Sequence, residues 1–201
     1  MPKSKLRKPR NDFNALFAAA LIAAITGDLK PLRACLLSGV NPDSPERGNF
    51  MRSLLFWHDL PDSVAKVLLD AKADASARDT AGFTPLHNAN VGVARLLLLR
   101  GADIEAREAA YGGTPLLVHA AMGRADMVEF LLDRGANVDA KTDDGDTAYD
   151  VAIAAGYVAV CNVLKRHDAA RRRGGLTAVA ASSLAGNRRT PAASSEEQRR
   201  M

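Results

Sequence analysis

The chain has 201 residues, of which 47% are hydrophobic and 25% are charged, and these proportions suit one folded domain with tails. Its net charge of +4 is unevenly distributed: residues 1–10 carry five Lys or Arg and no acid, and residues 165–201 carry nine against three acids. Residues 11–164 are therefore acidic. This distribution argues against a basic nucleic-acid-binding stripe along the folded body.

The first predicted segment is a basic, disordered arm over residues 1–12. The apolar run that follows, ALFAAALIAAITG over residues 15–27, imitates the apolar region of a signal peptide behind a basic start. The run is too short to span a membrane. Because residues 18–27 share the register of a repeat, we interpret them as the first helix of the fold. Export or organelle targeting through this segment remains the alternative.

The most informative feature is an internal repeat. Thr84, Thr114 and Thr147 open the similar segments TPLH, TPLL and TAYD, and the first two lead to LLLLRGAD and LLDRGANV. Two earlier segments lack these letters but keep the same spacing of 21 positions: Ala18 to Gly39 and Met51 to Lys72 match Thr114 to Gly135. The predicted units start at positions 18, 51, 84, 114 and 147. These starts are 33, 33, 30 and 33 residues apart. A period of about 33 residues indicates stacked units of supersecondary structure.

The chemistry of each unit predicts two helices. Thr84 and Thr114 can cap a helix start, and each is followed by a proline, which suits the first helical position. Apolar residues then recur with helical periodicity. Gly101 and Gly135 follow the second helix, where a left-handed residue relieves its last carbonyls. Lys72 occupies the corresponding position in the second unit.

These motifs resemble the ankyrin repeat, most clearly over residues 113–141. The resemblance implies an all-α repeat solenoid, an ankyrin stack of helix-turn-helix units joined by β-hairpin-like loops, with disordered basic tails. The expected repeat domain covers residues 13–168, and a disordered tail covers residues 169–201. The units are expected near residues 14–46, 47–79, 80–109, 110–142 and 143–167.

Two units depart from the pattern. The second lacks the TPLH motif and reads MRSLLFWHDLPDS. In the third, Thr84 and Gly101 lie closer together in sequence than Thr114 and Gly135 do in the fourth, so we expect a helical turn to be missing around residues 90–92. A local change in curvature there would either shape a partner site or be neutral drift.

In ankyrin proteins, partner contacts are usually made by hairpin tips and the adjacent ends of first helices. On the tips, the resemblance therefore selects Arg47, Phe50, Arg78, Phe83, Arg107, Tyr111, Lys141, Asp143 and Asp144. On the first-helix ends, it selects His58, Asp59 and Met122. Aromatic and Arg side chains are frequent interface anchors. Phe50, Phe83 and Tyr111 would form an apolar rail flanked by arginines, unless these rings pack onto neighbouring hairpins.

We predict no catalytic, cofactor or metal site. His87 and His119 are interpreted as structural, and no Cys or His spacing matches a zinc site. The acidic turn at Asp143 and Asp144 lacks the further ligands that a calcium loop needs. The two cysteines fall in the first and last units, too far apart for a disulfide. They suit a reducing compartment.

The expected function is a non-catalytic protein–protein interaction module: an adaptor, inhibitor or recruitment subunit. We expect a monomer that binds a protein partner on its concave surface and resides in the cytoplasm. One alternative is a scaffold whose basic termini bind nucleic acid or an anionic membrane, which steep salt dependence would reveal. Another is an exported ankyrin effector that acts on host proteins.

Overall fold

The computed structural model describes residues 13–43, 53–57 and 59–186, with side chains described up to Arg172. These residues form α-helices and two short 3-10 helices and no strand, and Lys141 and Thr147 form an isolated antiparallel bridge. In chain order the elements are α1 (Phe13–Thr26), α2 (Lys30–Leu37), η1 (Leu54–Phe56), α3 (Asp62–Asp70), η2 (Pro85–His87), α4 (Val91–Leu99), α5 (Pro115–Ala121), α6 (Ala125–Asp133), α7 (Ala148–Ala154) and α8 (Val158–Gly186). The predicted all-α repeat fold is confirmed.

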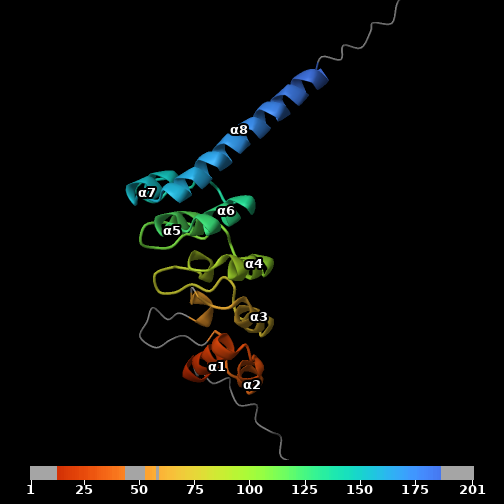
Figure 1. Cartoon of the computed structure of the whole chain (residues 1–201), viewed down its shortest axis with the longest axis vertical. Coiled ribbons are helices and arrows are strands. Elements are labelled where there is room, and N and C mark those ends of the chain that lie inside the picture. The colour runs from red at the N-terminus through yellow and green to blue at the C-terminus, as the bar shows by residue number, and fades with distance from the viewer. Residues whose placement is uncertain (1–12, 44–52, 58, 187–201) are drawn as a thin grey trace, which may run out of the picture. The chain divides into compact units, whose positions relative to one another are not determined.

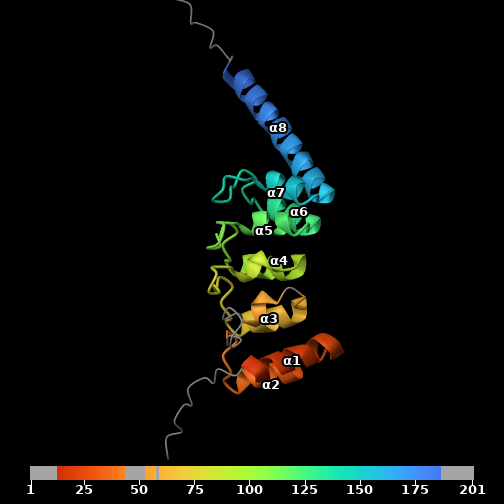
Figure 2. The ribbon, with the colours of Figure 1, turned by 90° about the vertical axis from the view of Figure 1, so that its left-hand side faces the viewer.

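The chain divides into two compact parts, Met1–Leu164 and Lys165–Met201, and the boundary falls inside α8. Within the first part the helices form two columns, with α1, α5 and α7 in one and α2, α3, α4 and α6 in the other (Figure 1). The loops that join successive units gather on one side of these helices (Figure 2). Each unit therefore contacts mainly its neighbours along the column, as expected of a repeat stack.

A single apolar core runs through the first part. It extends from Leu16 on α1 through Leu68 and Leu97 to Leu131 and Leu164, all buried. The second helices α3, α4 and α6 contribute large aliphatic side chains, while the facing first helices contribute many alanines. Small residues let the helices approach closely, and burial of this surface against the next unit supplies the main stabilising free energy.

The first helices of the second and third units are reduced to the 3-10 turns η1 and η2. In the third unit this shortening matches the predicted loss of a helical turn. Two asparagines follow η2 and compensate for the loss: Asn88 donates to the carbonyl of Phe56, and Asn90 donates to that of Leu60. Asn90 also accepts from the Val93 amide and so caps α4. Side-chain amides thus satisfy carbonyls that the shortened helices leave exposed.

Helix α8 differs from the expected disordered tail. The sequence analysis placed disorder from residue 169, whereas the structure continues the helix to Gly186. Residues 169–186 are rich in alanine, and a helix nucleated by a packed segment grows by one hydrogen bond per added residue. The arm over residues 1–12 and residues 187–201 lie outside the described residues, and the domain limits remain predictions. Across the part of the chain that the structure describes, no helix is long and apolar enough to cross a membrane.

The residue after the second helix is left-handed in successive units, at Gly39, Lys72, Gly101 and Gly135. Lys72 has a φ of 71° and is the non-glycine residue with positive φ in the described chain. A β-carbon in this conformation crowds the following carbonyl oxygen at a cost of roughly 1–2 kcal/mol. The second unit therefore carries a local strain that the third and fourth units avoid.

We predict that Lys72→Gly raises the free energy of unfolding by about 1 kcal/mol, because relief of strain outweighs the added freedom of the unfolded chain. Urea denaturation followed by circular dichroism measures the change. The matched control is Gly101→Lys, since a β-carbon at Gly101 meets no heavy atom within 4 Å and introduces only backbone strain. This control should lose a similar amount. A less stable Lys72→Gly protein would contradict the assignment.

Candidate functional site

Backbone hydrogen bonds align the hairpin tips of units three to five. The Ala109 amide donates to the Ala81 carbonyl at 2.9 Å, and the Asp143 amide donates to the Tyr111 carbonyl at 2.8 Å. These bonds join one loop to the next along the side of the stack on which the loops gather (Figure 2). Side chains that are one repeat apart in sequence therefore share one surface.

Two predicted site residues, Arg78 and Arg107, bridge successive hairpins in the same way. Arg78 Nη1 donates to the Arg107 carbonyl at 2.8 Å, and Arg107 Nη1 donates to the Lys141 carbonyl at 2.9 Å. Arg107 Nη2 also forms an ion pair with Asp143 at 2.7 Å. Both arginines lie on the predicted surface. Their guanidinium groups hold the neighbouring loop in place, which limits them as independent partner contacts.

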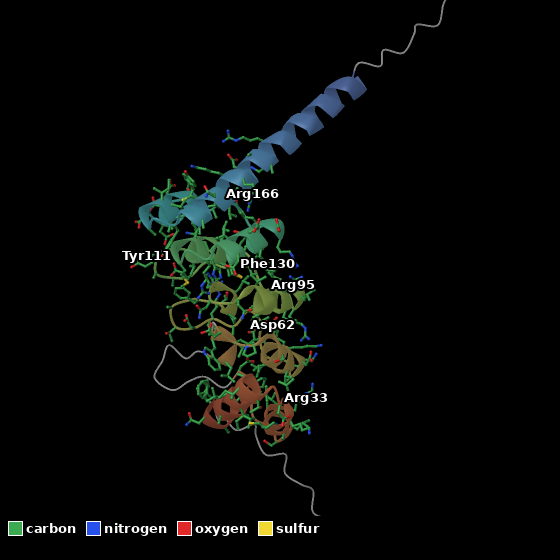
Figure 3. The ribbon with its side chains drawn as sticks, in the orientation of Figure 1. Arg33, Asp62, Arg95, Tyr111, Phe130 and Arg166 are labelled. Carbon is green, nitrogen blue, oxygen red and sulfur yellow. The ribbon has the colours of Figure 1, made fainter. Side chains whose placement is uncertain are left out.

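The predicted aromatic rail is only partly present. Phe83 is half-buried and its ring packs against that of His87 in a T-shaped arrangement, with 5.4 Å between the ring centroids. Tyr111, by contrast, is 68% exposed and projects away from the helices (Figure 3). Phe50 lies outside the described residues, together with Arg47 and His58. Among the described tips, Tyr111 is thus the aromatic anchor that faces solvent.

The remaining predicted residues are exposed. Asp59 lies between η1 and α3, and Met122 caps the end of α5. Lys141, Asp143 and Asp144 lie on the tip between units four and five. Because Asp146 on the same tip is also exposed, this tip is predominantly acidic.

Sequence reasoning missed Tyr157, which follows α7 and is 39% exposed. Its ring lies against Gly123, so closely that a β-carbon built on Gly123 would be 2.6 Å from the ring atom Cδ1. Gly123 directly follows the end of α5, so this contact joins the first-helix ends of units four and five. The sequence does hold a signal for this residue. Gly156 corresponds to Gly123 one repeat earlier, and an aromatic residue directly follows it.

The two buried histidines have structural roles. His87 Nδ1 accepts from the Thr84 amide, and its Nε2 donates to the Gly113 carbonyl of the next unit at 3.2 Å. His119 Nε2 donates to the Leu86 carbonyl of the preceding unit at 3.0 Å, while its Nδ1 is buried without a partner. Both rings are therefore neutral links between units three and four.

Burial disfavours the charged form of these rings. It lowers the pKa of His119 to about 4, although the bond to the Leu86 carbonyl acts in the opposite direction. Burial likewise lowers the pKa of His87. Among the described residues, no group of three His, Cys, Asp or Glu side chains could hold a metal ion. The polar groups at this interface thus join repeat units to one another.

The comparison with known proteins places these units in a family. Residues 88–173 match the family described as "Ankyrin repeats (3 copies)". Residues 88–173 therefore carry ankyrin repeats. Ankyrin repeats indicate a protein–protein interaction module and are generally non-catalytic.

Curated relatives share these repeats. The B-cell lymphoma 3 protein homolog of Mus musculus is 33% identical over 157 residues, which is 74% of this chain and 35% of the relative. Protein PhlB of Serratia liquefaciens is 38% identical over 114 residues, or 53% of this chain and 50% of the relative. The neurogenic locus notch homolog protein 1 of Homo sapiens is 38% identical over 110 residues, or 52% and 4%. The chain thus matches half or less of each relative's length.

We predict that acid destabilises the stack through His119. The pKa of His119 in the folded chain is about 4, below the ordinary value of 6.5. The contribution of the neutral ring to the free energy of unfolding is therefore complete above pH 6.5 and is lost as the pH falls toward 4. Between pH 7.5 and 5 this single ring accounts for a loss of about 2 kcal/mol in the free energy of unfolding. Urea denaturation at the two pH values measures the loss.

In His119→Ala, the overall stability should be lower at pH 7.5 because the link to unit three is gone. The difference between pH 7.5 and 5 should shrink by about 2 kcal/mol, and His87 should account for much of what remains. An unchanged difference in this variant would show that His119 does not titrate in the folded chain as its burial requires.

Proposed function

We propose that this chain is an adaptor, inhibitor or recruitment subunit that holds a protein on the hairpin tips and first-helix ends of units four and five. The proposed contact surface, called the tip surface below, consists of Tyr111, Met122, Lys141, Asp143, Asp144 and Tyr157. The observations that carry the proposal are the exposure of Tyr111 on a hairpin tip and of Met122 and Tyr157 at the first-helix ends of units four and five. Exposed aromatic side chains on ordered backbone lose little entropy on binding and are frequent anchors.

The chemistry of the tip surface indicates the chemistry of its partner. Asp144 and Asp146 are exposed carboxylates, while Asp143 is already paired with Arg107. Met122 and Tyr157 add exposed apolar groups at the first-helix ends of the same units. A partner segment that presents apolar side chains together with Lys or Arg would complement both features, and its charges would accelerate association at low salt.

The expected cytoplasmic location forms part of this proposal. Cys35 and Cys161 are both in the thiol form, which suits a reducing compartment. Cys161 is buried and acts as a small apolar side chain in the core. The activities of the longer relatives are not assumed for this chain, because the matches cover half or less of their length.

We predict that the double substitution Tyr111→Ala and Tyr157→Ala weakens partner binding by about 100-fold or more, since two anchors of at least about 1–2 kcal/mol each are removed. Affinity capture from a lysate of the source organism, with the wild-type chain as bait, identifies the partner. Titration of that partner against both proteins then gives the two dissociation constants.

The matched control is Leu99→Ala, which removes an exposed apolar side chain from the second-helix column at α4. This control should bind the partner as the wild type does. Retention of full affinity by the double variant would reject the tip surface. Equal loss in the control would show that the partner contacts the opposite column instead.

A further inference from the structure

The hairpin that leads into the fourth unit is one residue longer than the hairpin before it. We call residues 78–84 the third hairpin and residues 107–114 the fourth hairpin, each running from an arginine to the threonine that precedes the next helix. In both, a left-handed glycine lies two residues before that threonine, Gly82 in the third and Gly112 in the fourth. The additional residue therefore precedes Gly112, in the stretch that carries the exposed Tyr111.

A buried carboxylate closes this longer loop from the inside. Glu108 is 4% exposed. Its Oε1 accepts from the amides of Tyr111 at 2.9 Å and Gly113 at 2.8 Å, and its Oε2 accepts from the Ala110 amide. Burial alone would raise the pKa of this carboxyl, but the three amide donors outweigh burial and hold the pKa below its ordinary value. Hydrogen bonds to an ionised group are stronger than neutral ones, so this one side chain orders the loop.

The third hairpin shows how a shorter acid serves a shorter loop. Asp79 occupies the place that Glu108 has in the fourth hairpin, directly after the arginine, and it is 6% exposed. Its Oδ1 accepts from the amides of Ala81 and Phe83, both at 2.9 Å. The additional methylene of Glu108 carries the carboxylate further from the backbone, to the amides of a loop that has one more residue. The length of the acid therefore matches the length of each loop.

Tyr111 is held by both of its backbone polar groups. Its amide donates to Glu108, and its carbonyl accepts from the Asp143 amide of the following hairpin at 2.8 Å. A β-carbon built on Gly112 would overlap Arg107 Nη2 and Asp143 Oδ1, so this glycine provides the space for the ion pair between those two residues. The backbone of Tyr111 is thus fixed from both sides, while its side chain is 68% exposed and projects away from the helices (Figure 3).

We propose that Glu108 is the positioning residue of the tip surface: it holds the fourth hairpin in the form that presents Tyr111 to the partner. This inference rests on the proposed function, because it requires Tyr111 to be a partner contact. Glu108 itself is buried and acts through Tyr111. A side chain on an ordered backbone loses less freedom on binding than one on a loose loop, so the order that Glu108 imposes contributes to affinity.

Amide hydrogen exchange on the full chain tests whether Glu108 orders the loop, and it needs no partner. In Glu108→Gln an NH2 group replaces one of the two accepting oxygens, so at least one loop amide loses its acceptor. The amides of residues 110–113 should therefore exchange about tenfold faster or more. The matched variant Asp79→Asn should accelerate exchange in the third hairpin and leave the fourth unchanged. Wild-type exchange at residues 110–113 in Glu108→Gln would overturn the proposal.

A double-mutant cycle tests whether this order matters for binding. The probe is the partner protein purified after its capture by the wild-type chain, and circular dichroism confirms that every variant is folded. Glu108→Gln should weaken binding about three- to tenfold, because the loop must then be ordered on binding. In the Tyr111→Ala background the same substitution should have no further effect, since Glu108 acts through that side chain. Asp79→Asn, which alters the equivalent buried acid, should bind as the wild type does.

The outcomes distinguish this inference from the proposed function. Weaker binding by Tyr111→Ala together with full affinity in Glu108→Gln would overturn the positioning role and leave the tip surface in place. An equal loss from Glu108→Gln with and without Tyr111 would also overturn it, because the effect would then come from the stability of the stack. Full affinity in Tyr111→Ala would reject that residue as a contact, and the positioning role with it. A loss that requires Tyr111 supports the proposal.

Discussion

The structure depends on contact between successive repeat units, because no unit can bury its apolar face alone. Polar side chains set the register of that contact. Arg78 reaches the carbonyl of Arg107, His87 reaches that of Gly113, and His119 reaches back to that of Leu86. Each bond joins residues in different units, so it forms only when neighbouring units are stacked in one register. Apolar burial provides the driving force, and these bonds select the arrangement.

This constraint also determines which residues are available for binding. The buried imidazoles and the bridging guanidinium groups are engaged in holding units together. The exposed residues of units four and five include Tyr111, Met122, Tyr157 and Asp144 on the acidic tip. Such a surface suits recognition by shape, apolar contact and charge, which agrees with the generally non-catalytic character of ankyrin repeats.

The first unit has a described repeat on one side only. Its helix α1 carries an apolar side toward Leu32 and the core and a second apolar side with Leu21 and Ile25 exposed. In the interior units a following or preceding repeat would cover such residues. The tip surface and the exposed apolar residues of α1 therefore lie on different units and can be altered independently.

The sequence by itself determined the period, the helix pairs and the alignment of Gly101 and Gly135, because turn and capping chemistry acts over a few residues and repeats visibly. It also identified Tyr111 and Met122 as candidate contacts. Only the tertiary structure decided that Phe83 packs against His87 and that Tyr157 lies over Gly123, because those contacts depend on how adjacent units stack. The local sequence pattern predicts at which position of the repeat a side chain lies, whereas the packing of the neighbouring unit decides whether that side chain is buried.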